Sequence, residues 1–193
     1  MKSITISGSL RENVGKRDAK QLRYDGQVPA VLYGGATQTH FSVSVADLKP
    51  VVYTPVVHFI DLEVAGKKIA QAIIKDLQFH PLTEEIIHVD FMQLDEAKPV
   101  TIEIPVRLTG TSPGVKVGGK LVQKLRKLRV KALPKHHIDN IDVSIESLEV
   151  GKSVRVGDLK ADNLIITNAA EDTIVSVTTS RALRQAEQEA AKK

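Results

Sequence analysis

Between Arg11 and Arg23 the chain carries five cations against two acids, which is a high local density of positive charge. An apolar run then closes on Tyr33-Gly34-Gly35. Lysine and arginine side chains bind phosphate, and an aromatic ring can stack on an unpaired base. These residue types together suit RNA better than a small substrate. The five cations are Arg11, Lys16, Arg17, Lys20 and Arg23.

Helical spacing would place three of these cations on one surface. Residues 18–25 predict a short helix that ends at Gly26, because glycine readily adopts the left-handed conformation that closes a helix. If the helix covers residues 16–25, Lys16, Lys20 and Arg23 share a face by spacings of four and three. A solvated basic helix without a partner has the same pattern. Spacing alone therefore leaves RNA binding and simple solvation about equally open.

A second group of polar side chains lies in the segment EIIHVDFMQL, whose alternation predicts a strand. His88 and Asp90 are two residues apart and so face the same side of it. Such a pair can be a catalytic dyad, two metal ligands, or a polar patch in which the carboxylate orients the imidazole. No serine or cysteine nucleophile motif accompanies the pair, and the other histidines are scattered. We therefore expect no catalytic site, no metal site and no cofactor, and on its own Tyr33 fits a core residue.

The segment from Lys116 to Lys135 contains eight Lys or Arg residues and no acid. The intervening apolar residues fit a strand but also helical spacing, so a helix lying on a membrane surface remains an alternative. We expect a strand or hairpin with one basic side and a polyanionic partner, as a second RNA contact. The eight cations are Lys116, Lys120, Lys124, Arg126, Lys127, Arg129, Lys131 and Lys135.

Composition favours a mainly β protein with short helices. Of the 193 residues, 42% are hydrophobic and only 4% aromatic, so the apolar weight falls on Val, Ile and Leu, often in alternation. The absence of cysteine excludes disulfides and thiolate chemistry and fits a reducing cytoplasm. The first residues are not typical of a signal peptide, and no apolar run approaches the roughly 20 residues of a membrane helix. We expect a cytoplasmic protein with no membrane partner.

The charged, proline-ended segment Asp95–Pro99 predicts a junction between two domains, at 1–95 and 98–180. The Ala-, Glu- and Lys-rich residues 181–193 predict a solvated, flexible tail. Net charge changes sign along the chain: +4 over residues 1–23, −6 over 24–96 and +6 over 97–193. Such patterning points to a polyanionic partner. Residues 111–119 hold four Gly or Pro in nine and predict an exposed loop.

The paired motifs GKRDAKQLRYDGQVPAVLYG and FHPLTEEIIHVDF resemble those of bacterial large-subunit ribosomal protein twenty-five. In the second half, GTSPGVKVGGKL, LPKHHIDNIDVSIESLEVGKSVRVGDL and EDTIVSV are similar to the long, two-domain form of that family, the general stress protein CTC type. The resemblance extends to about Ser180. It implies a small closed β-barrel with short helices in the first domain and a separate β-rich second domain.

The resemblance also implies a function: a non-enzymatic protein of the large ribosomal subunit that binds 5S rRNA through its first domain. Tyr24 stands where some relatives carry a second arginine. The basic run in the second half would then be a separate contact, with large-subunit rRNA or a neighbouring protein. A stress-related regulator that binds RNA off the ribosome is the alternative. The 5S contacts that the family implies are Arg11, Lys16, Lys20, Arg23, Tyr33, Gln78, His88 and Asp90.

Overall fold

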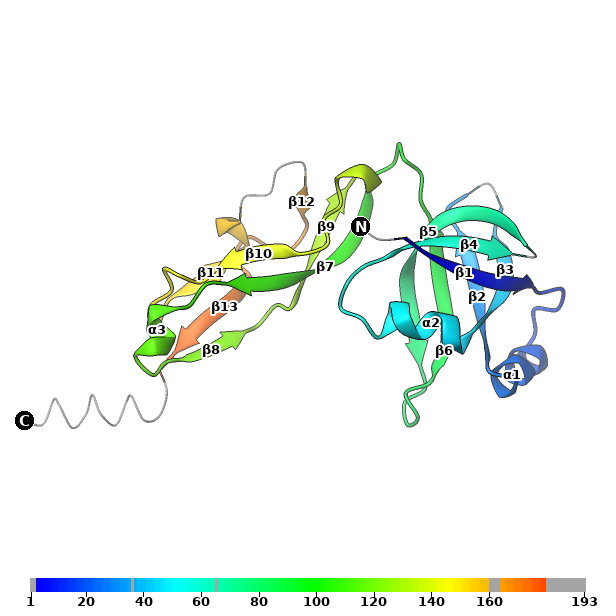
Figure 1. Ribbon diagram of the computed structural model, residues 1–193, viewed down its shortest axis with the longest axis horizontal. Coiled ribbons are helices and arrows are strands. Elements are labelled where there is room, and N and C mark those ends of the chain that lie inside the picture. The colour runs from blue at the N-terminus through cyan, green and yellow to red at the C-terminus, as the bar shows by residue number, and fades with distance from the viewer. Residues whose placement is uncertain (1–2, 36, 65, 160–163, 180–193) are drawn as a thin grey trace, which may run out of the picture. The chain divides into compact units, whose positions relative to one another are not determined.

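The computed structural model describes residues 3–35, 37–64, 66–159 and 164–179 (Figure 1). The chain divides into two compact units. One comprises residues 1–100 together with 133–137, and the other residues 101–132 and 138–193. The tail predicted at 181–193 lies outside the described residues.

Six strands of the first unit form a closed barrel in the order β1-β3-β2-β6-β5-β4 (Figure 1). The pairs β1–β4 and β2–β6 are parallel, and the other four are antiparallel. Closure leaves no strand edge unpaired. The predicted β-rich fold with an N-terminal barrel is confirmed. The strands are β1 (Ser3–Leu10), β2 (Gln27–Tyr33), β3 (Thr39–Ser44), β4 (Phe59–Val64), β5 (Lys67–Phe79) and β6 (Ile86–Gln93).

Alternate residues of these strands fill the barrel interior. On β6, Val89 and Phe91 are fully buried, whereas His88 and Asp90, which alternate with them along the strand, are half-exposed. The rings of Phe41 and Phe91 lie 5.6 Å apart in a tilted arrangement at the centre of this core. A small barrel has room inside for side chains only. Polar residues of the same strands must therefore face outward, where a ligand can reach them.

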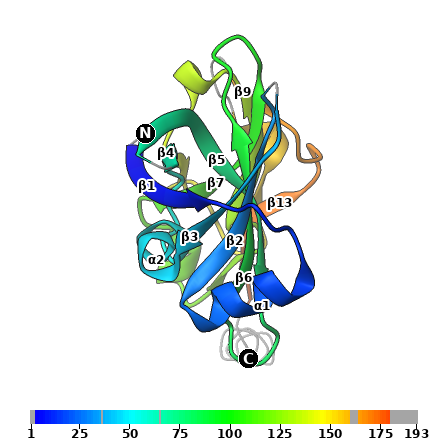
Figure 2. The same cartoon turned by 90° about the vertical axis from the view of Figure 1, so that its right-hand side faces the viewer.

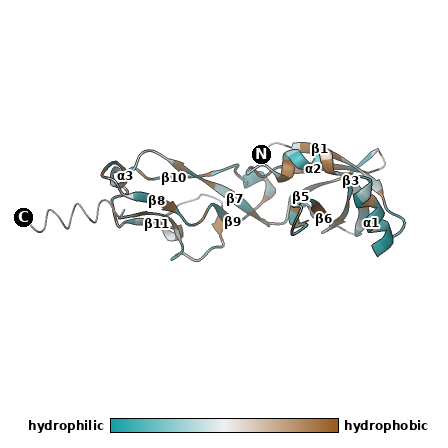
Figure 3. Cartoon of the chain, turned by 90° about the horizontal axis from the view of Figure 1, so that it is seen from below, coloured by the Kyte–Doolittle hydropathy of each residue, from teal (hydrophilic) through white to brown (hydrophobic). Residues whose placement is uncertain are grey.

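Two helices flank the barrel. Helix α1 (Lys16–Tyr24) begins two residues before the predicted start, and Gly26 beyond it has a φ of +71°. None of its residues is buried, and its surface is largely hydrophilic (Figure 3). Helix α2 (Val45–Val52) begins where Ser44 Oγ accepts a hydrogen bond from the Ala46 amide, and it buries apolar side chains against the core. Thus α2 stabilises the barrel, whereas α1 is available for a partner.

The second unit consists of two sheets, in the orders β10-β7-β9-β12 and β11-β13-β8. Both contribute to one core, which includes Ile104, Leu128, Val143 and Ile174. The strands are β7 (Val100–Thr109), β8 (Lys120–Gln123), β9 (Lys127–Ala132), β10 (Ile141–Ser144), β11 (Ser153–Arg155), β12 (Ile165–Ile166) and β13 (Thr173–Thr178). Three short helical turns accompany them: α3 (Pro113–Lys116), η1 (Pro134–His136) and η2 (Val156–Asp158).

The basic run after Gly119 is neither a helix nor a hairpin. It forms two strands in different sheets, because β8 pairs with β13 whereas β9 lies between β7 and β12. At the crossing, the amides of Lys124 and Leu125 both donate to the Ile174 carbonyl, at 2.8 and 3.2 Å. The crossing resets the alternation, so a pattern that looked irregular for one strand is regular for two. The membrane-surface helix is therefore wrong.

The prediction of an exposed loop at residues 111–119 is only partly correct. They contain α3, and both Ser112 and Gly114 are buried. The Ser112 hydroxyl donates to the Leu148 carbonyl. A Cβ on Gly114 would lie 2.7 Å from the backbone of Glu149 and Val150, so the glycine permits two segments to approach closely.

The barrel core yields a stability prediction with a built-in control. Phe91→Ala should lower the free energy of unfolding of the barrel by about 3–5 kcal/mol, because it leaves a cavity beside Phe41. Phe79→Ala, at a 43% exposed site on β5, should cost about 1 kcal/mol or less. The chain has no Trp, and its three tyrosines, Tyr24, Tyr33 and Tyr53, all lie in the first unit. Urea unfolding followed by tyrosine fluorescence therefore reports on the barrel; equal costs for the two variants would contradict this account of the core.

Candidate RNA-binding surface

The outer face of three neighbouring strands, β2, β6 and β5, collects four of the residues predicted to bind RNA. In the register of β5 and β6, Gln78 lies opposite His88 and Asp76 opposite Asp90. On the other side, β2 runs parallel to β6 and ends at Tyr33. Since paired residues of adjacent strands face the same side, these side chains form one polar patch on the barrel.

Within this patch, His88 and Asp90 are paired, as their spacing predicted. Nδ1 of His88 lies 2.8 Å from Oδ1 of Asp90, and both side chains are partly exposed. The carboxylate therefore orients the ring through Nδ1 and leaves Nε2 for a ligand. An imidazole held in this way suits a directional hydrogen bond to RNA.

Tyr33 lies at the edge of the same patch and is half-buried. Burial of the side chain raises the pKa of its hydroxyl, and the negative charges of Asp90 and Asp76 raise that pKa further. The hydroxyl thus stays protonated and can donate a hydrogen bond. The registers of β2 with β6 and of β6 with β5 place Tyr33 and both carboxylates on the same face of neighbouring strands.

Asp76 is a residue that the sequence analysis missed. It is exposed, it lies opposite Asp90, and its Oδ1 accepts from the Leu77 amide at 2.9 Å. Its position two residues before Gln78 on the same strand was the available signal. Two carboxylates repel phosphate but accept hydrogen bonds from the amino groups of bases. This part of the surface therefore suits base edges rather than the RNA backbone.

Helix α1 is joined to this patch by one side chain. Arg23 Nε donates to the carbonyl of Ile87, at 3.2 Å, directly beside His88. In Figure 2, α1 lies next to β6. Lys16 and Lys20 precede Arg23 on the same helical face, by the predicted spacing. The cations of α1 and the polar patch of the sheet are therefore parts of one surface, which we call the α1–β6 surface.

Tyr24 adds an aromatic ring to the α1–β6 surface. It is 76% exposed, and Lys20 Nζ lies 5.8 Å from the centre of its ring. An exposed ring next to a cation can stack on a base while the cation binds the adjoining phosphate. In the sequence, Tyr24 stands where some relatives carry a second arginine, and stacking of its ring was the contact expected there in place of a phosphate contact.

Arg11 occupies a different position from the other cations. Its side chain is only 8% exposed, and Nε and Nη2 lie 3.0 and 2.5 Å from Oδ2 of Asp18. The guanidinium is therefore engaged within the protein, where it positions the first turn of α1. A direct contact between Arg11 and RNA stays a prediction, and it would require Asp18 to share the guanidinium.

The eight cations of the second basic run are spread over several elements and both units. Lys127, Arg129 and Lys131 alternate with three buried residues of β9 and make one basic stripe, within which Arg129 Nε lies 3.2 Å from Glu103. Lys135 belongs to the first unit, where Glu96 lies 2.8 Å away and raises the pKa of the lysine. The other four lie on α3, on β8 and in the crossing between the sheets: Lys116, Lys120, Lys124 and Arg126.

Neither a metal centre nor a membrane helix is found in the described part of the chain. No group of three or more His, Asp or Glu side chains there could hold a metal ion. None of the helices there is long and apolar enough to cross a membrane.

Comparison with known proteins identifies the family. The model of the ribosomal L25p family matches residues 6–91, and that of the C-terminal domain of ribosomal protein TL5 matches residues 99–181. A large ribosomal subunit protein bL25 from Cytophaga hutchinsonii is 47% identical over 193 residues, covering 100% of both chains. The chain belongs to the ribosomal L25p family. Proteins of the same name from Phocaeicola vulgatus and Amoebophilus asiaticus are 47% and 46% identical, over 96% and 98% of this chain and 97% and 96% of their own.

Membership in this family confirms the resemblance seen in the sequence motifs. Two family models, one for each half, agree with the long, two-domain form. The L25p family consists of ribosomal proteins, so the chain is not an enzyme and the His88–Asp90 pair is not a catalytic dyad.

Proposed function

We propose that this chain is a structural component of the large ribosomal subunit that binds 5S rRNA through the α1–β6 surface. The observation that carries the proposal is the hydrogen bond from Arg23 to the Ile87 carbonyl. It joins a cationic helix to a sheet face that bears oriented hydrogen-bonding groups. Relatives named as large ribosomal subunit proteins support the ribosomal part of the proposal. The chain would then act in the cytoplasm, as part of the translating ribonucleoprotein.

In this proposal the cations of α1 and the hydrogen-bonding groups of the sheet have different roles. Lys16, Lys20 and Arg23 would bind phosphates, which provides affinity without reading sequence. His88, Asp90 and Gln78, held on rigid strands, would bind base or ribose edges and fix the register. The first domain would bind RNA despite its net negative charge because its cations are concentrated on one helix. The carboxylates beside that helix would accept hydrogen bonds from exposed bases and would not face phosphate, which they repel.

The domain assignment makes a direct prediction: residues 1–96 alone should fold and bind 5S RNA. All six barrel strands and the whole α1–β6 surface lie within this fragment. Its affinity for a 5S RNA fragment, measured by filter binding or calorimetry, should match that of the full chain within about threefold, which is less than 1 kcal/mol. A folded fragment that fails to bind, while the full chain binds, would show that the assignment is wrong.

Salt dependence separates the roles of Arg23 and His88. Arg23→Ala should reduce the slope of log affinity against log salt by about one unit, because one phosphate contact is lost. His88→Ala should weaken binding but leave the slope nearly unchanged, since it removes a hydrogen bond rather than a fixed charge.

Arg23→Lys is the matched control for these two variants. It retains the charge and the salt slope but loses the planar donor that reaches Ile87, so any drop in affinity reports on the positioning of α1. Equal salt slopes for the alanine variants would contradict the proposed division of roles.

We also propose a second, weaker contact with large-subunit rRNA through the basic stripe of β9. Lys127 and Lys131 are exposed on the same face as Arg129, and the described structure shows no ion pair for either. Two linked contacts multiply through effective concentration, so the weaker one matters only on a particle that offers both. A neighbouring protein is the other partner that this stripe could meet.

Charge reversal tests the stripe. Lys127→Glu with Lys131→Glu should leave the affinity for isolated 5S RNA unchanged but release the protein from intact large subunits at lower salt. Lys127→Arg with Lys131→Arg, which preserves the charge, should behave as the wild type does. If salt-wash release from subunits is the same for the Glu and Arg pairs, the stripe is only a solvated face.

A further inference from the structure

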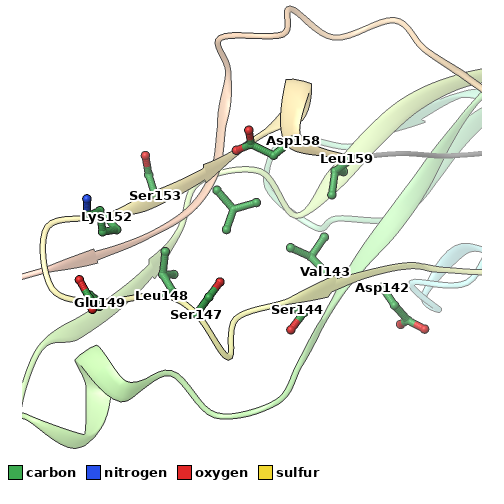
Figure 4. Close-up of a pocket in the computed structure, with 11 residues that line it drawn as sticks. Asp142, Val143, Ser144, Ser147, Leu148, Glu149, Lys152, Ser153, Asp158 and Leu159 are labelled. Atoms are coloured by element: carbon green, nitrogen blue, oxygen red, sulfur yellow. The ribbon is translucent and has the colours of Figure 1, made fainter.

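A pocket in the second unit shares no residue with the α1–β6 surface or with the β9 stripe. It opens between β10 and the segment that runs from Ser147 through β11 to Leu159, with a volume of about 630 Å³ (Figure 4). Val143, Leu148, Val154 and Leu159 provide its apolar lining. Its size falls within the range of roughly 300–1,000 Å³ that is usual for ligand sites.

The two strands that border the pocket are edge strands. In the described sheets, β10 is hydrogen-bonded only to β7, and β11 only to β13. Each strand therefore has one side whose backbone amides and carbonyls lack a strand partner. An extended peptide can pair with such an edge and place alternate side chains into an adjoining pocket.

The charge around the pocket is the opposite of that on β9. Asp142, Glu149 and Asp158 line it together with a single cation, Lys152. Asp158 also accepts the Arg155 amide at 2.8 Å, which leaves Asp142 and Glu149 as the carboxylates free to meet a ligand. Figure 4 shows both at the margin, on either side of Leu148 and Val143. A polyphosphate backbone would be repelled here, whereas lysine or arginine would be attracted.

We propose that this pocket binds an extended, cationic peptide segment of another protein. One bulky apolar side chain of the peptide occupies the lining of Val143, Leu148, Val154 and Leu159. Flanking lysines or arginines reach Asp142 and Glu149, and the peptide backbone pairs with the free edge of β10. The proposal does not depend on 5S binding, because no residue of the pocket belongs to the α1–β6 surface or to the β9 stripe.

The experiment selects ligands without assuming a sequence. A phage-displayed library of random heptapeptides is selected on the immobilised full chain and, in parallel, on Asp142→Lys/Glu149→Lys. Both positions are exposed, so the reversals should not disturb the core. The control is Glu171→Lys, an exposed acid outside the pocket. The best wild-type peptide is then synthesised with a fluorescent label, and its affinity is measured by polarisation for all three proteins.

Peptides enriched on the wild type should combine Lys or Arg with one bulky apolar residue. The double reversal should weaken binding of the labelled peptide at least tenfold, and Glu171→Lys less than twofold. Proline placed beside the apolar residue should also weaken binding, because it removes a backbone donor. The proposal is overturned if no peptide is enriched on the wild type, or if the double reversal leaves peptide binding intact. It is equally overturned if that reversal dissociates a dimer of the chain, since a second copy would then occupy the pocket.

Discussion

Closure of the six-stranded barrel is the constraint on which the α1–β6 surface depends. The parallel pairing of β2 with β6 brings together segments that are about sixty residues apart in the chain. That pairing places the helix preceding β2 against the strand that carries His88, and Arg23 then spans the short remaining distance to Ile87. Because a small closed barrel has no free edges and little capacity to deform, the patch and the helix are held at fixed separation. Such preorganisation would lower the entropic cost of the RNA binding that we propose for this surface.

Positive and negative side chains lie on different parts of the α1–β6 surface. Arg11 and Asp18 neutralise one another at the base of α1, and Lys20 approaches the ring of Tyr24. Asp76 and Asp90 occupy the sheet, where they raise the pKa of Tyr33. The exposed cations of α1 are therefore separated from the two carboxylates of the sheet. This arrangement matches the two faces that RNA offers, with phosphates outside and base edges within the groove.

The second unit bears two surfaces of opposite charge, one on β9 and one between β10 and β11. The crossing at Lys124 and Leu125 carries the chain from one sheet to the other, and strict alternation then places basic residues on the outside of β9. Edge strands of both sheets border a pocket whose lining combines four apolar side chains with three acids. A basic stripe and an acidic pocket in one small unit are more easily explained by two different partners than by one.

The sequence by itself determined the β-rich class, the presence of a short helix before Gly26, the common face of His88 and Asp90, and the family. These features depend on local periodicity and on motifs that extend over a few residues, so no distant contact is needed to predict them. Even there, the two strands hidden in the basic run were missed because a change of sheet leaves no clear mark in the alternation. Only the tertiary structure decided which residues meet. It pairs the Arg11 guanidinium with Asp18 and adds Asp76 to the surface. It also assigned Lys135 to the first unit. The physical reason is that strand order and register are set by burial of the whole core, which is a property of the folded chain and of no single segment.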